Sequence, residues 1–153
     1  MSDRPAPLSA ACTITIAQPV ERVFAFVTDL PATPRWRTSV KEVTPPVEGE
    51  LDLGVRFGAA TRVLGKRWEW VLEVTAWEPP HRFGYEVVEG SAALAVTYVC
   101  EPDGDGCRFT LRGEGKRPGG LFGAVVVPAA RRVMTRDMRR HLGNLKALLE
   151  PRA

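Results

Sequence analysis

The sequence is poor in the residues that would mark a disulfide scaffold or a membrane protein. Only three cysteines occur among 153 residues, an odd count without metal-ligand spacing. The longest apolar run, residues 121–130, has about half the length that crosses a bilayer. The first twelve residues lack the charged-then-apolar pattern of a secretory signal. These absences predict a soluble, cytoplasmic protein with free thiols, although a bond between Cys100 and Cys107, which flank one predicted hairpin, stays open.

Strong charge and recognisable chemical motifs are also missing. The formal net charge is only +3, which does not by itself indicate nucleic-acid binding. No Cys/His cluster, glycine-rich phosphate loop or Ser-His-Asp set occurs, so we expect no metal, no cofactor and no nucleic-acid partner. Apolar residues make up 44% of the chain, as in globular proteins that bury one core. We expect the protein to be a monomer or a homodimer, and the sequence does not decide between the two.

Apolar periodicity predicts one α+β domain. Residues 12–17 alternate as a strand, and residues 19–30 carry apolar side chains at helical spacing. About six more strands follow between residues 39 and 115, joined mostly by short turns and therefore antiparallel. Residues 121–149 then read as a long amphipathic helix that covers the sheet. Its apolar stripe contains Val127, Ala130, Met134, Met138, Leu142, Leu145, Leu148 and Leu149.

The expected architecture is a curved antiparallel sheet of about seven strands around the long C-terminal helix, with one or two short helices after the first strand. Residues 1–10 are expected to form a flexible arm, and residues 11–150 a single domain. A sheet that curls strongly around one helix need not close completely over it. A cavity between the two layers is therefore expected.

Five segments, in this order, carry a family resemblance. They are ITIAQPVERVFAFVTDLPATPRW, LGVRF, WEWVLEVTAWEPPHRFGYEV, DGDGCRFTL and HLGNLKALLE. Together they resemble the START-like, helix-grip superfamily (SRPBCC), and within it the polyketide cyclase/dehydrase-type proteins. The resemblance implies a small hydrophobic guest held between sheet and helix. It names no reaction, because the superfamily includes cyclases and aromatases as well as carriers of lipids or quinones, and no catalytic motif is shared among them.

Aromatic side chains concentrate on the expected inner face of the sheet. Alternation places Trp68 and Trp70 on one face of their strand and Trp77 on the other. Each ring either fills the core or lines a pocket, and both interpretations stay open. The residues predicted to bind a ligand are Trp36, Phe57, Trp70, Tyr85, Tyr98, Phe109, Met134 and Met138.

Three polar side chains are the catalytic candidates: His141, Tyr85 and Arg131. Asp137 lies four residues before His141, so it would orient the imidazole as a general base, while Arg131 would bind an oxyanion of the guest. The alternative is an edge pair on the helix and an arginine that extends past the sheet rim. The outer helix face is either solvated or contacts an anionic membrane; it carries Arg132, Arg136, Arg139 and Arg140.

Overall fold

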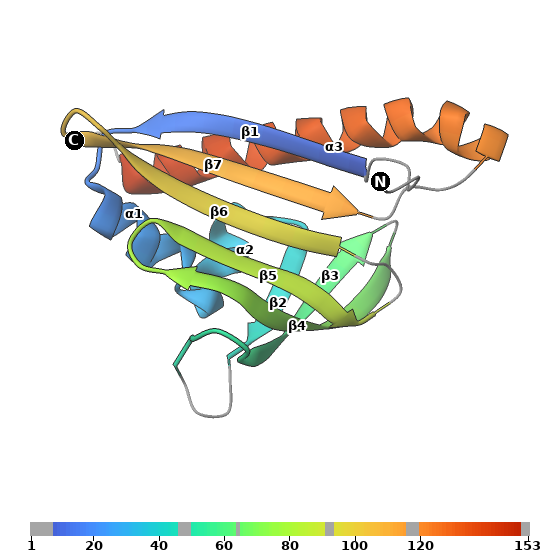
Figure 1. Cartoon of the computed structure of the whole chain (residues 1–153), viewed down its shortest axis with the longest axis horizontal. Helices are drawn as coiled ribbons and strands as arrows, with labels where there is room; N and C mark the ends of the chain where they lie inside the picture. The colour runs from blue at the N-terminus through green and yellow to red at the C-terminus, as the bar shows by residue number, and fades with distance from the viewer. Residues whose placement is uncertain (1–7, 46–49, 64, 91–93, 116–119, 151–153) are drawn as a thin grey trace, which may run out of the picture.

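The computed structural model describes residues 8–45, 50–63, 65–90, 94–115 and 120–150. Helices α1 (Val20–Val27), η1 (Leu30–Ala32) and α2 (Thr33–Trp36) follow the first strand, and α3 (Gly120–Leu149) ends the described chain. The expected helix-grip fold is confirmed (Figure 1). The strands are β1 (Leu8–Ile16), β2 (Val40–Thr44), β3 (Arg56–Val63), β4 (Lys66–Glu78), β5 (Arg82–Glu89), β6 (Leu94–Asp103) and β7 (Gly106–Gly115).

All seven strands form one antiparallel sheet in the order β1-β7-β6-β5-β4-β3-β2. Strands β1 and β2 lie at opposite edges, so the chain crosses the sheet through α1, η1 and α2. Helix α3 runs beside β1 and β7 (Figure 1). Strand β1 already begins at Leu8, which pairs with Gly115, so residues 8–10 belong to the sheet and not to an arm. Residues 1–7 lie outside the described part of the chain.

The short helices form where proline and apolar spacing direct them. Pro19 precedes α1 with an extended backbone, and the buried residues Val20, Val23, Phe24 and Val27 follow at helical spacing. The hydroxyl of Thr28 donates to the Phe24 carbonyl at 2.7 Å at the C-terminal end. A proline near the start of η1 and another near the start of α2 interrupt the backbone ladder. The crossing is therefore made of short helical pieces that can follow a curved sheet.

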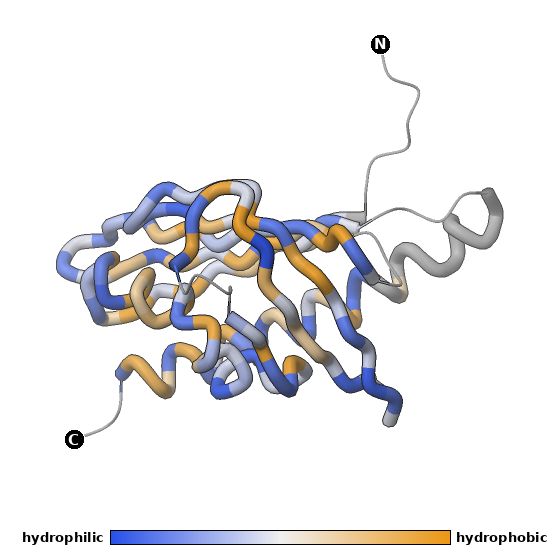
Figure 2. Tube along the Cα trace, turned by 90° about the horizontal axis from the view of Figure 1, so that it is seen from below, coloured by the Kyte–Doolittle hydropathy of each residue, from blue (hydrophilic) through white to orange (hydrophobic). Residues whose placement is uncertain are grey.

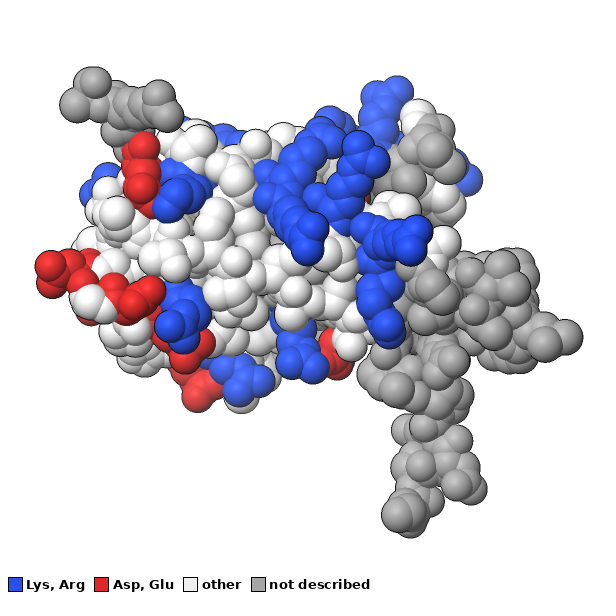
Figure 3. All heavy atoms as spheres, turned by 90° about the horizontal axis from the view of Figure 1, so that it is seen from above, with Lys and Arg blue, Asp and Glu red and all other residues white. Residues whose placement is uncertain are grey.

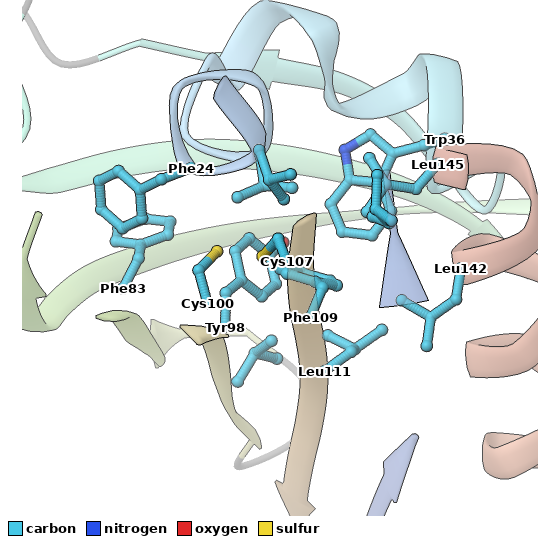
Figure 4. Close-up of a cluster of buried hydrophobic side chains, with 14 of the residues drawn as sticks. Phe24, Trp36, Phe83, Tyr98, Cys100, Cys107, Phe109, Leu111, Leu142 and Leu145 are labelled. Atoms are coloured by element: carbon cyan, nitrogen blue, oxygen red, sulfur yellow. The ribbon is translucent and has the colours of Figure 1, made fainter. Parts of the chain in front are cut away.

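The core lies between the concave face of the sheet and the helices. Trp36, Phe83, Phe109 and Leu145 are fully buried in it, and side chains from α1, α2, β5, β6, β7 and α3 meet there (Figure 4). The Trp36 ring lies 5.5 Å from Tyr98 and 6.0 Å from Phe109, edge-on in both cases. Hydrophobic and hydrophilic residues alternate along the strands, as a sheet with one covered face requires (Figure 2).

The long helix presents the predicted apolar stripe to this core. Met138, Leu142, Leu145 and Leu149 are buried, while Met134 and Leu148 are half-buried. The stripe prediction is confirmed for these positions. The side chains of Val127 and Ala130 lie outside the described residues.

The pairing of β4 with β5 shifts register twice, and the second shift reverses the placement of Trp77. Val74 pairs with Tyr85, but the register shifts between Val74 and Ala76, after which Trp77 pairs with Phe83. A bulge of this kind inserts one residue and turns every later side chain to the other face. The Trp77 ring accordingly lies 5.7 Å from Phe83 and packs, half-buried, against the core, so the expectation that it sits with the polar set is wrong.

Candidate functional site

A cavity of about 220 Å³ lies between the sheet and α3. Strands β6 and β7 supply one wall, the α2–β2 connection supplies Arg37 and Ser39, and α3 supplies the other wall. The apolar lining consists of Leu94, Val96, Leu111, Gly113, Met134 and Met138. A second, smaller cavity of about 30 Å³ lies among β2, β3, β4, β5, β6 and the short helices, and Arg37 lines this one as well.

Because Gly113 has no side chain, Met134 and Met138 approach strand β7 closely at this position. A Cβ at this position would lie 2.7 Å from the Cε of Met134 and 3.0 Å from the Cε of Met138. Both obstacles are the ends of flexible side chains, which adapt to irregular spaces more easily than branched or aromatic residues. The wall that faces Gly113 can therefore change its shape.

A polar cluster lies beside the cavity, formed by one arginine and two tyrosines. The Nη1 of Arg37 donates to the hydroxyl of Tyr85 and, at 3.2 Å, to that of Tyr98. The two hydroxyls lie 3.2 Å apart and are hydrogen-bonded to each other. Burial, the neighbouring Tyr85 and the hydrogen bond with Tyr85 raise the pKa of Tyr98 well above its ordinary value, although the charge and the hydrogen bond of Arg37 oppose this. The Tyr98 phenol is therefore neutral at neutral pH.

His141 borders the same cavity and is buried, with 5% of its surface exposed. Loss of solvent around the ring and the nearby charges of Arg37 and Arg140 lower its pKa to about 4, while Asp137 opposes the shift. The imidazole is therefore neutral at neutral pH. Asp137 lines the cavity too, but its side chain is exposed to solvent.

The predicted ligand-binding residues fall into four groups. Met134 and Met138 line the larger cavity, and Phe57, Tyr85 and Tyr98 line the smaller one. Trp36 and Phe109 have no exposed surface and pack as core. Trp70 borders a different hollow, which is lined by residues of β2, β3, β4 and the end of β5. Its Nε1 donates a hydrogen bond to the Thr61 hydroxyl at 2.9 Å.

Arg131 lies away from the cavity, in the position expected from the alternative in which it extends past the sheet rim. Its side chain is exposed, and its Nε donates to the Ser9 carbonyl on β1 at 3.2 Å. It borders an exposed stretch of α3 together with Arg132, Arg136 and Arg139, and Figure 3 shows basic side chains gathered on the side of the molecule where α3 and β1 lie. The helical wheel places it near the apolar stripe, but here α3 packs on the edge strand β1, which covers only a narrow arc of the helix.

Sequence reasoning missed Arg37. This residue follows the buried Trp36 in the aperiodic segment PRWRTS, where neither helical nor strand periodicity assigns a face. The one available signal is its position directly between a core tryptophan and a strand, which carries the side chain across the inner edge of the fold. Only the structure brings it beside Tyr85 and Tyr98.

The cysteines are free, as predicted. Cys100 and Cys107 are buried on the core face, and burial is the main cause that raises the pKa of each thiol. Neither thiol is an activated nucleophile. Among the described residues, no helix combines the length and apolarity needed to cross a membrane.

Comparisons with known proteins agree with this architecture. The sequence profile of the family described as "Polyketide cyclase / dehydrase and lipid transport" matches residues 8–150. No curated protein matches the sequence. A START superfamily protein from Mycobacterium smegmatis has a similar solved structure, with a TM-score of 0.74, 13% identity and coverage of 93% of this chain and 97% of that one.

Two further solved structures have the same fold. One is a polyketide-cyclase-like protein from Corynebacterium glutamicum, with a TM-score of 0.69, 23% identity and coverage of 95% of this chain and 93% of that one. The other is a major latex-like protein from Panax ginseng, with a TM-score of 0.68, 12% identity and coverage of 96% of this chain and 100% of that one. At such identities the likeness concerns the fold alone.

Proposed function

Because the chain belongs to the polyketide cyclase/dehydrase and lipid transport family, we propose that it binds a small hydrophobic or aromatic molecule between the sheet and α3. The observation that carries the proposal is the cavity lined by Leu111, Gly113, Met134 and Met138. Apolar walls with a few polar groups are the usual lining of small-molecule sites.

The size of the cavity limits the guest. Its volume of about 220 Å³ exceeds the ~150 Å³ of an apolar cavity that holds benzene. It is smaller than the ~300–1,000 Å³ of sites for drug-sized ligands. A compound of one or two rings, or a short aliphatic chain, fits this range. Movement of the two methionines would enlarge it further.

Binding and transfer are favoured over cyclisation by the state of His141. A general base works best when its pKa lies near the working pH. The pKa of His141 is lowered to about 4, so its imidazole is only a weak base at neutral pH. A protein that only binds and releases a guest needs no general base. We therefore favour a non-catalytic carrier of a lipid- or quinone-like molecule as the form of this function.

Cyclase or dehydrase chemistry is the second candidate. It is favoured by the position of Arg37 at the cavity with the Tyr85 hydroxyl beside it, because such donors stabilise the enolate oxygen of a folding polyketide. The two candidates separate in Tyr85→Phe. An enzyme would lose turnover and keep binding its guest, whereas a carrier would have no turnover to lose.

The binding itself can be tested by isothermal titration with naphthol, a neutral two-ring probe. Gly113→Leu should abolish binding, because the new side chain fills the space between β7 and the methionines. Gly143→Leu adds the same side chain at an exposed helical position with no atom within 4 Å of a new Cβ, so it should bind as the wild type does. Absence of binding to the wild type, or equal binding by Gly113→Leu, would refute the proposal.

A further inference from the structure

Arg37 is a largely enclosed cation without an anionic partner in the described part of the chain. Its Nη1 is hydrogen-bonded only to the hydroxyls of Tyr85 and Tyr98. None of the ion pairs between described residues includes it. Buried charges in proteins are normally paired, because removal from water is costly unless an opposite charge replaces the solvent. The tyrosine hydroxyls supply dipoles but no compensating charge.

Two nitrogen atoms of the Arg37 guanidinium, Nε and Nη2, donate no hydrogen bond to a described residue. Its Nε is shielded from solvent and has no acceptor among the described residues. No described group accepts a hydrogen bond from its Nη2 either, since both of its hydrogen bonds start from Nη1. Nε and Nη2 form one edge of the planar guanidinium, and this edge matches the two oxygens of a carboxylate. Nε is closed to solvent, so a carboxylate that binds both atoms requires the surrounding side chains to move.

The surroundings of Arg37 favour an anion over a second cation or a purely apolar group. Arg37 lines both cavities, and the larger one also holds apolar side chains, the neutral His141, Ser39 and Asp137. The acidic group at this cavity is Asp137, whose side chain is exposed and screened by water. Water is excluded at the Nε of Arg37, so the charge acts on that side with little screening.

We infer that the natural guest carries a carboxylate, which binds the free edge of Arg37 while its apolar body lies against Met134 and Met138. This inference rests on the proposed function and makes it more specific: the ligand class is a small aromatic or aliphatic acid. The competing interpretation treats Arg37 as a structural link between α2 and the two tyrosines. A purely structural arginine would give an acid no advantage over a neutral compound of the same shape.

The test compares naphthoate with naphthamide, which share one ring system and differ in charge, by isothermal titration at neutral pH. The wild type should bind naphthoate at least about tenfold more tightly, since hydrogen bonds to charged groups contribute about 1.5–3 kcal/mol. Arg37→Met should bind the amide at least as well as the acid, because the acid then loses its hydration without compensation. Arg37→Lys, which keeps the charge but not the planar edge, should retain part of the preference. Thermal unfolding of each variant confirms that it is folded.

Two results would overturn the inference, and they differ in what else they remove. If the wild type binds naphthoate and naphthamide equally, the carboxylate assignment fails while the proposed function stands. If neither compound binds and naphthol does not bind either, the proposed function fails as well. The wild-type comparison needs no substitution, so it decides the matter even if the Arg37 variants do not fold.

Discussion

The buried histidine on α3 should make the stability of the protein depend on pH in a defined window. His141 has its pKa lowered from 6.5 to about 4, first by loss of solvent and then by the charges of Arg37 and Arg140, with Asp137 acting in the opposite direction. The unfolded chain therefore takes up a proton at this residue at a higher pH than the native state does. Between these two pKa values the unfolded state binds more protons, so stability falls as the pH falls.

The size of the effect follows from the same two pKa values. Each tenfold change in proton affinity corresponds to about 1.4 kcal/mol. A fall from 6.5 to about 4 therefore sets an upper limit of about 3 kcal/mol on the stability lost through this residue. Solvent reaches the cavity at the exposed Asp137, and screening there reduces the expected loss to about 2 kcal/mol.

Urea unfolding at a series of pH values measures this contribution when the wild type is compared with His141→Gln. The variant has no titrating group at this position, whereas all other groups titrate in both proteins. Relative to the variant, the wild type should lose about 2 kcal/mol of its free energy of unfolding between neutral pH and pH 4. A difference that stays constant across this range would show that the imidazole is not buried as described.

Three further substitutions test the packing, each by urea unfolding. Gly90→Ala should destabilise the protein by about 1–3 kcal/mol, because its Cβ would lie 2.4 Å from the rigid Trp70 ring, and a neutral result would contradict that contact. Gly143→Ala should instead stabilise it by about 0.5–1 kcal/mol, since nothing lies near the new Cβ and alanine favours the helix; a loss of stability would mean that this face is covered. Leu145→Ala should cost about 2–5 kcal/mol, because Leu145 is fully buried, and a cost below about 1 kcal/mol would place it outside the core.

Periodicity predicts the fold well because the sheet and α3 each bury one continuous face. The predicted aromatic residues Phe57, Tyr85 and Tyr98 lie on the inside, where the Tyr85 ring packs against the other two. It fails at Trp77, because a single bulge after Val74 shifts the register and no local sequence signal marks that bulge. Alternation is reliable only as long as the strand pairs without interruption.

The candidate site is less predictable because it is assembled from aperiodic and tertiary features. Met134, Met138 and His141 follow from the helical stripe, and all three border the cavity. Arg37 does not follow, since its position depends on how α2 crosses the sheet. Arg131 is misplaced because a helical wheel gives a direction but not the width of the surface that covers the helix.

The central claim is that the space between the sheet and α3 accepts a guest, and the methionine methyl groups report on it directly. The chain has three methionines, so carbon-13 methyl spectra contain few signals. Titration with naphthol should shift the signals of Met134 and Met138 and give cross-relaxation between these methyls and the probe, because both line the cavity. Signals of Met134 and Met138 that stay unchanged at saturating naphthol would show that no guest enters and would contradict the account.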